Sequence, residues 1–308
     1  MKYKDWLAEW LKNYIQITNK QRTCDRYNDI INRFILPNLG EYELCQITPI
    51  VLQKFITLLS SKVNKKTNKC ISASYINVVI SVVRSSLKTA YTLGYLTEYT
   101  ADKIKRPKIS EKAVQCFTKL EQKKIEQFIL TSKKQRLKGV IICFYTGLRI
   151  GELLALTWDD IDFVKRRLQV AKSCYDGYID GKHCVINGTP KTENSIRQIP
   201  LSKPIVELLK NMKKQNQSEY VISYSGKQML VRSYQRSFEL LLKRLNISHK
   251  GFHATRHTFA TRAIECGIDV KTLSEILGHK NAMVTLNRYA HSLWEHKADM
   301  MNKLGKRL

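Results

Sequence analysis

The chain has 308 residues, of which 43% are hydrophobic and 26% are charged, a composition typical of a soluble globular protein of about two domains. Its charge balance is unusual, because 53 Lys and Arg residues stand against 26 Asp and Glu residues, a formal net charge of +27. Such an excess attracts polyanions, so a nucleic acid is a more plausible partner than none. Residues 1–110 already hold 18 Lys and Arg against 8 acidic residues, so both halves are basic.

Other partners and compartments are disfavoured by the same sequence. The longest apolar runs are too short to span a membrane, so no membrane partner is expected. The eight cysteines are scattered without a CxxC pair, which indicates reduced thiols in a cytoplasmic protein. Cys174, His183 and Cys184 match no common zinc spacing, so no metal site is expected there.

The first half of the chain is predicted to be helical. Apolar residues recur at intervals of three and four in four stretches, which are residues 5–15, 23–39, 47–63 and 73–94. The expected capping residues are Thr23, Thr48, Ser72 or Ser74 at helix starts, with Gly40 and Gly94 after helix ends. We therefore predict an all-helical domain over residues 1–106.

A basic connector follows, and Pro107 within it is unfavourable in a helix. We expect residues 107–113 to be a linker and residues 114–308 to be a second domain. Helical spacing returns at 118–130 and 138–162.

Short, turn-bounded segments within 166–200 then predict three strands, before helices resume at residue 203. The expected fold is mainly α with a small antiparallel β-sheet, in two domains.

Arg149 is the first candidate for chemistry. It stands between Leu148 and Ile150, just before an apolar helix. A guanidinium between apolar residues cannot lose its proton, so it requires an anion to compensate its charge. Glu152 lies one helical turn further on, where it could orient Arg149 towards a ligand or simply form an internal pair with it.

His253 and Arg256 stand at the start of a predicted core helix, three residues apart and so on one face. Free N–H groups and the helix dipole favour an anion at such a start. The alternative is that both side chains only cap and decorate the helix. His257 is expected to support the helix.

Three further residues complete the set of candidates. Gly278 is predicted to end a helix and to leave His279 on a turn. Tyr289 is a weak nucleophile unless cations stabilise its phenolate, and packing or stacking is its ordinary role. Lys191 is predicted at the tip of a hairpin, exposed or reaching into a cleft as a proton donor.

The order of these residues resembles that of the tyrosine recombinase (phage integrase) family. The matching segments are TGLRIGELLALTWDDID, PKTENSIRQIPL, HATRHTFAT, LGH and TLNRYAH. The helical first half is similar to the core-binding domain of integrases, so the resemblance covers almost the whole chain. The KTENS segment and the long insert between the first two strands favour the mobile-element branch.

The resemblance implies DNA cleavage and rejoining through a covalent 3′-phosphotyrosine, without a metal or other cofactor. Tyr289 would be the nucleophile, and His253 would accept its proton. Lys191 would protonate the departing 5′-hydroxyl. No divalent ion is required when cationic groups hold the phosphate, and no clustered Asp/Glu metal site is evident in the sequence.

The remaining site residues would hold the reacting phosphate. The resemblance implies that Arg149 and Arg256 clamp its non-bridging oxygens, a task that suits a planar guanidinium. His279 would donate a further hydrogen bond to the same oxygens. Glu152 would orient Arg149 from behind.

The implied partners are double-stranded DNA with specific core sites and three further copies of the chain in a tetramer. An excisionase or a DNA-bending accessory protein is a further possible partner. Apolar spacing in residues 292–304 predicts a terminal helix that docks on a neighbouring protomer rather than on its own chain. The helical pattern begins at residue 5, so the additional arm-binding domain of many integrases is expected to be missing.

Three rival functions stay open at this point. The first is a non-catalytic DNA-binding relative, against which the filled site positions argue. The second is a topoisomerase that nicks single strands, which would relax supercoiled DNA without sequence preference. The third is a housekeeping recombinase that resolves chromosome dimers.

Overall fold

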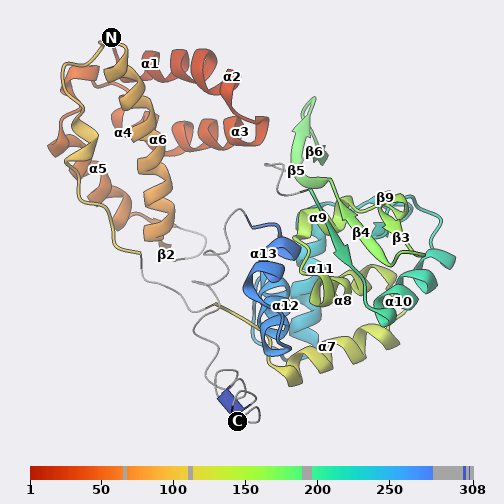
Figure 1. The fold of residues 1–308 in the computed structure, drawn as a ribbon. Coiled ribbons are helices and arrows are strands. Elements are labelled where there is room, and N and C mark those ends of the chain that lie inside the picture. Colours follow the sequence, from red (N-terminus) through yellow and green to blue (C-terminus); the bar gives the residue numbers. More distant parts are fainter. Residues whose placement is uncertain (65–67, 110–113, 189–195, 280–300, 303–304, 306–308) are drawn as a thin grey trace. The chain divides into compact units, whose positions relative to one another are not determined.

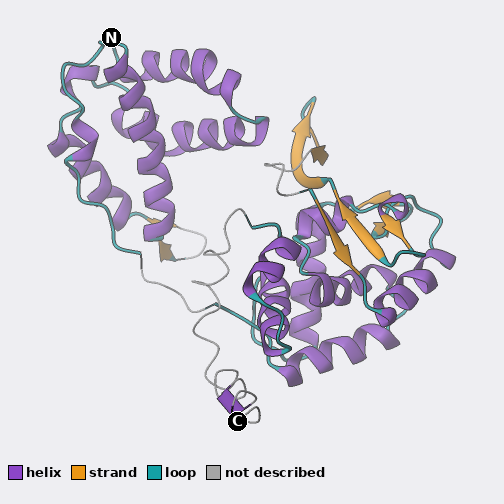
Figure 2. Cartoon of the chain, in the orientation of Figure 1, coloured by secondary structure: helices purple, strands orange, loops and turns teal. Residues whose placement is uncertain are grey.

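The computed structural model describes residues 1–64, 68–109, 114–188, 196–279, 301–302 and 305. The chain divides into two compact units, unit 1 (Met1–Lys112) and unit 2 (Ala113–Leu308). Helices dominate both units, and the strands are short and antiparallel, as Figure 2 shows. The predicted fold class is therefore confirmed. Among the described residues, no helix has both the length and the apolar character needed to cross a membrane.

Unit 1 contains the four predicted helical stretches (Figure 1). Their elements are α1 (Tyr3–Trp10), η1 (Leu11–Ile15), α2 (Gln16–Thr18), α3 (Gln21–Ile30), η2 (Ile31–Ile35), α4 (Leu36–Leu39), η3 (Leu44–Gln46), α5 (Pro49–Ser61), α6 (Ala73–Thr92) and η4 (Thr100–Asp102). The first two stretches each pass through a π-helical turn, η1 and η2. One hairpin was not expected, β1 (Val63–Asn64) with β2 (Lys69–Cys70), so the unit is not all-helical.

Side-chain caps explain where two of these helices begin. Thr48 accepts a hydrogen bond from the Val51 N–H at the start of α5, and Ser72 accepts one from the Tyr75 N–H at the start of α6. The prediction that Thr23 caps a helix is wrong, because α3 already begins at Gln21.

Two buried tryptophans join the first helix to α6. Trp6 donates its indole N–H to the Ser86 carbonyl at 3.2 Å, and Trp10 donates to the Thr89 hydroxyl at 3.1 Å. Both rings are at most 1% exposed, so each indole N–H finds an acceptor within the core. Hydrophobic burial and satisfied polar groups therefore act together in unit 1.

The named elements of unit 2 run from α7 to α13. Its elements are α7 (Lys119–Thr131), η5 (Gln135–Leu137), α8 (Lys138–Thr146), α9 (Ile150–Ala155), η6 (Trp158–Asp160), β3 (Ile161–Asp162), β4 (Arg167–Val170), β5 (Ser173–Ile179), β6 (Lys182–Gly188), β7 (Arg197–Pro200), α10 (Lys203–Lys214), β8 (Ser223–Tyr224), β9 (Lys227–Gln228), α11 (Val231–Arg244), α12 (His253–Glu265) and α13 (Val270–Leu277).

The strands between residues 166 and 200 differ from the prediction of one three-stranded sheet. Within its described residues this segment has four strands, and they belong to two sheets: β4 lies between β3 and β7 and pairs with both, whereas β5 pairs with β6. The β5–β6 turn places Asp180 and Gly181 at positive φ, as a two-residue hairpin turn requires. A further hairpin, β8–β9, interrupts the predicted run of helices.

Gly147 divides the predicted helical stretch 138–162 into α8 and α9. Its φ of +66° ends α8 in the left-handed conformation. A Cβ there would lie 2.5 Å from Phe259 of α12 and 2.8 Å from Leu277 of α13, so these helices pack directly against the turn. The turn sets Arg149 at the start of α9.

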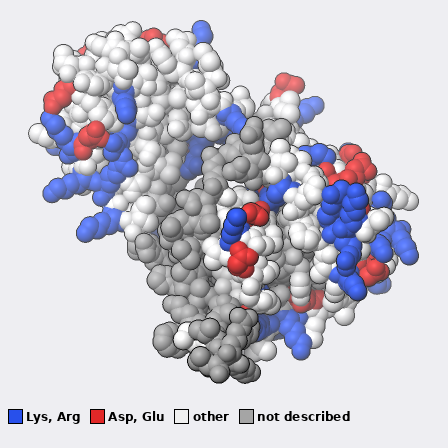
Figure 3. Space-filling view, in the orientation of Figure 1, with Lys and Arg blue, Asp and Glu red and all other residues white. Residues whose placement is uncertain are grey.

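Lys and Arg side chains are spread over both units on the face that Figure 3 shows. The excess of basic residues is thus a property of both units and is not confined to one segment. Such a surface suits a polyanionic partner.

Candidate active site

Arg149 is the N-cap residue of α9, and both its backbone N–H and its guanidinium bind the carboxylate of Glu152. The Arg149 N–H donates to Glu152 Oε2 at 2.9 Å, and Arg149 Nη1 donates to Glu152 Oε1 at 2.7 Å. Arg149 Nη2 reaches the Gly278 carbonyl at 3.4 Å. The Arg149 side chain is 38% exposed whereas that of Glu152 is 5% exposed, so a ligand can reach the guanidinium but not the carboxylate.

Arg256 lies in the first turns of α12 and is only 2% exposed. Its Nη1 donates to the Gly147 carbonyl at 2.8 Å, and its Nη2 donates to the Leu277 carbonyl at 2.6 Å. These acceptors stand at the C-terminal ends of α8 and α13, where the helix dipoles are negative. Two helix ends therefore stabilise a buried positive charge.

His253 is the first residue of α12, which confirms its predicted place in the first turn. Its ring meets that of His257 edge to face, with the ring centroids 4.6 Å apart. His253 is exposed and His257 is half-buried. The supporting role of His257 and the role of His253 in proton transfer both stay predictions.

The end of α13 connects both arginines to His279. Gly278 ends the helix with a φ of +63°, as predicted, and the His279 N–H donates to the Ser274 carbonyl at 3.0 Å. Because Leu277 accepts from Arg256 and Gly278 accepts from Arg149, one turn positions two guanidinium groups and the following histidine.

Lys191 and Tyr289 lie outside the described residues, and so does most of the predicted tail helix, residues 292–304. Lys191 falls between β6 and β7, which pair with different strands in the described part of the chain. The predicted hairpin with Lys191 at its tip falls on residues outside the described ranges, so it stays a prediction.

Arg197 belongs to this cluster but was not predicted. It opens β7, and its Nη2 and Nη1 donate to the two carboxylate oxygens of Glu152 at 2.9 and 3.2 Å. The sequence did contain a sign of this role. Arg197 is two and four residues before Ile199 and Leu201, so the three side chains share the face of the strand that points into the core. An arginine on the buried face of a strand needs an internal carboxylate.

Glu152 is the shared anion of the cluster. Burial of its carboxyl would by itself raise its pKa, but the hydrogen bonds and charge of Arg197 and the charge of Arg149 outweigh burial and lower the pKa to about 2. Glu152 is therefore ionised at neutral pH, and one carboxylate is shared by two guanidinium groups.

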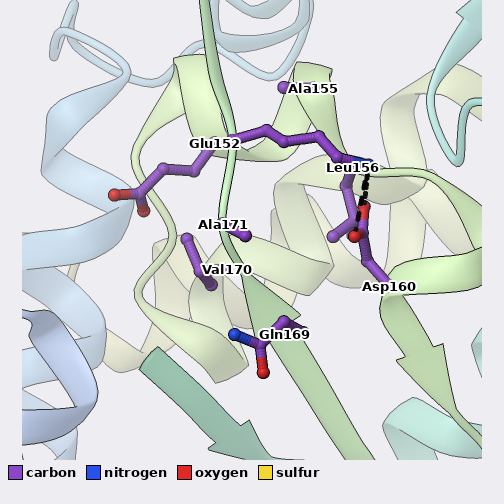
Figure 4. Close-up of a pocket in the computed structure, with 8 residues that line it drawn as sticks. Glu152, Ala155, Leu156, Asp160, Gln169, Val170 and Ala171 are labelled. Atoms are coloured by element: carbon purple, nitrogen blue, oxygen red, sulfur yellow. Dashed lines mark hydrogen bonds and ion pairs between the residues drawn. The ribbon is translucent and has the colours of Figure 1, made fainter. Parts of the chain in front are cut away.

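A hollow behind the cluster is shown in Figure 4. It is lined by Glu152, Ala155, Leu156, Asp160 and residues 169–172. The hollow has no room for a water molecule. The carboxylate of Glu152 points away from the other labelled residues, and the Asp160 carboxylate binds Lys172 Nζ at 3.4 Å. The arginine cluster, and not this hollow, is therefore the candidate site.

The family model of the phage integrase family matches residues 116–296, which include all of the cluster. The chain belongs to the phage integrase family. A model of the N-terminal SAM-like domain of phage integrases matches residues 2–60. The predicted family is confirmed, and unit 2 carries a tyrosine recombinase catalytic domain, so the protein is an enzyme of this family.

Relatives within the family include a XerC-like recombinase and an integrase. The chain is 29% identical to a XerC-like tyrosine recombinase of Caldanaerobacter subterraneus, with 97% of this chain and 82% of that protein aligned. It is 27% identical to the ICEBs1 integrase of Bacillus subtilis, with 76% of this chain and 66% of that protein aligned.

The fold has close counterparts among solved structures. A Tn1549 transposon integrase in complex with transposon right end DNA is similar with a TM-score of 0.82 and 22% identity. The match covers 99% of this chain and 100% of that chain. It shows that the two proteins share a fold.

The ionised Glu152 predicts how stability depends on pH. Its folded-state pKa lies below the ordinary value of 4.5, so its contribution to stability is complete above that value and is lost as the pH falls towards 2. Glu152→Gln should lower the free energy of unfolding by on the order of 3 kcal/mol at pH 7 and by much less near pH 3. Denaturant unfolding at several pH values measures this difference.

The matched control is Glu207→Gln, in an exposed pair with Lys210 on α10. Its unfolding curve should follow that of the wild type at each pH, because exposed pairs contribute little. Equal effects of the two substitutions would contradict the stabilising role assigned to Glu152.

Proposed function

We propose that the protein is the recombinase of a mobile element, which cleaves and rejoins DNA through a covalent 3′-phosphotyrosine to integrate and excise that element. The observation that carries this proposal is the convergence of Arg149 and Arg256 on the turn that ends α13. Two cations held by one turn form a binding site for a single phosphate group.

The two arginines would divide the work of binding the phosphate. Arg256 is fixed by two helix ends and supplies a rigid charge, while Arg149 presents an accessible guanidinium. Negative charge grows on the non-bridging oxygens as the nucleophile attacks, and preorganised donors stabilise it. His279, which follows the same turn, would donate a third hydrogen bond.

Proton transfers would accompany the exchange of one P–O bond for another. In the proposed step Tyr289 Oη attacks phosphorus, its proton passes to His253, and the P–O5′ bond breaks. Lys191 donates a proton to the departing 5′-oxygen. Rejoining reverses each transfer, so the phosphotyrosine conserves the energy of the broken bond and the proposal requires no ATP and no metal ion.

Tyr289→Phe tests the covalent step. The variant should bind DNA as the wild type does but form no protein–DNA adduct, because only the phenol oxygen is lost. The measurement is a denaturing gel of protein incubated with nicked duplex DNA, beside a filter-binding curve. Tyr224→Phe, which changes an exposed tyrosine of β8, is the control and should form the adduct normally.

Four outcomes would contradict the proposal. Adduct formation by Tyr289→Phe would place the nucleophile elsewhere, and loss of wild-type cleavage with a magnesium chelator would show that a metal is needed. Absence of any wild-type adduct would favour the non-catalytic relative. Relaxation of supercoiled DNA without sequence preference would favour a topoisomerase.

A second candidate function is chromosome-dimer resolution, favoured by the XerC-like relative that aligns with 97% of this chain. The mobile-element assignment rests on the KTENS segment, the insert and the alignment with the ICEBs1 integrase. Sequencing the DNA trapped on the protein from a nicked suicide library should reveal the ends of a mobile element and its insertion site. Recovery of a single chromosomal site that is unrelated to an element would favour dimer resolution.

We further propose that four copies act together on two duplexes at specific core sites in the cytoplasm, with an excisionase or DNA-bending protein setting direction.

Apolar residues at helical spacing in 292–304 suit docking on a neighbour. Deleting residues 292–308 should reduce assembly to protomers on single sites, measured by native gel shift. Intact tetramers on DNA after deletion would exclude docking in trans.

A further inference from the structure

Arg197 lies where three elements of unit 2 meet. It begins β7 and is 8% exposed. Its Nη1 and Nη2 bind the two oxygens of Glu152 on α9, and its Nε donates to the Ile276 carbonyl of α13 at 2.6 Å. One guanidinium therefore joins β7 to the helix that begins at Arg149 and to the helix that ends before His279.

The α13 turn is shaped to accept this side chain. A Cβ on Gly278 would lie 3.0 Å from Arg197 Cδ and 3.2 Å from Arg197 Nη1, closer than ordinary packing allows. The backbone that carries His279 thus lies directly against Arg197, and a movement of one requires a movement of the other.

Arg197 also sets the net charge of the cluster, in addition to joining its three elements. Glu152 carries one negative charge, and Arg149 and Arg197 carry one positive charge each, so the three groups together keep one positive charge in excess. With Arg197 removed, Arg149 and Glu152 would form a neutral pair. The carboxylate would then compete with a phosphate for the donors of Arg149.

We propose that Arg197 is a positioning residue for DNA cleavage. Its hydrogen bonds to both oxygens of Glu152 keep the charge of Arg149 available for the scissile phosphate. The inference rests on the proposed function and adds to it a residue that does not itself touch the substrate. Its effect passes through Glu152, and this route distinguishes it from a residue that only stabilises the fold.

The test is a double-mutant cycle in the full chain with Arg197→Met, Glu152→Gln and the double variant. Each protein is incubated in single turnover with a nicked duplex that carries the site recovered from the trapping library, and the rate of adduct formation and the DNA affinity are measured. Arg197→Met should slow adduct formation on the order of 10- to 100-fold, less than loss of a direct oxyanion donor, with DNA affinity nearly unchanged.

The decisive measurement is the double variant. Neutralising Glu152 releases the charge of Arg149 again, so the double variant should form the adduct faster than Arg197→Met alone, although it has lost two buried groups. A merely structural role predicts the opposite, because a second loss of a buried hydrogen-bonding group would lower stability and rate further. A double variant as slow as Arg197→Met, or slower, would overturn the proposal.

Arg167→Met is the matched control, since Arg167 lies on β4 of the same sheet and contacts Asp162 and Gln198 instead of Glu152. It should cleave at the wild-type rate. If Arg197→Met fails to unfold cooperatively, Arg197→Lys takes its place in the cycle, with a smaller slowing that Glu152→Gln should again relieve. Absence of that relief would overturn the proposal.

Failure of the proposed function gives a different result from failure of this inference. A wild-type protein that forms no adduct with any DNA would overturn both. A wild type that forms the adduct, with Arg197→Met equally fast, would overturn only the role of Arg197.

Discussion

A buried positive charge at the junction of α8, α12 and α13 is the constraint on which the rest of the catalytic unit depends. Removing a guanidinium from water costs several kcal/mol unless good acceptors replace the lost hydration. Arg256 finds such acceptors in the carbonyls of Gly147 and Leu277, which the dipoles of two helices make more negative. The two helices must therefore end at the same point in space.

The glycines follow from this requirement. Gly147 and Gly278 both adopt positive φ directly at these two helix ends, so each helix stops without a side chain over the site. The lack of space also requires glycine at both positions. A Cβ at Gly147 would collide with Phe259, and a Cβ at Gly278 would crowd Arg197. The local chain geometry and the packing of distant elements thus select the same residue type.

Much of this site could be predicted from sequence, because the patterns that indicate it lie among neighbouring residues. Arg149 was noticeable because a charge stood in an apolar frame, and Gly278 because a glycine followed a periodic helix. Arg197 was missed because its partner is 45 positions away in the chain, and a single sequence does not show which acid a buried arginine meets.

The sheet arrangement was mispredicted for a related reason. Short strands reveal their length and polarity but not which neighbour they pair with, and β4 pairs with β7 across the whole β5–β6 hairpin. The mainly helical class and the starts of α5, α6 and α12 were local properties and were confirmed.

The two arginines of the site differ in a way that suits a phosphate ligand. Arg256 is almost fully buried and its donors to Gly147 and Leu277 hold it rigid, whereas Arg149 remains 38% exposed beside it. An anion that enters would meet one charge already fixed in place and one that can adjust to it. The ordering cost of binding then falls mainly on Arg149, and Glu152 reduces that cost by limiting how far the guanidinium can turn. Glu152 therefore assists phosphate binding in spite of its negative charge, provided that Arg197 shares that charge.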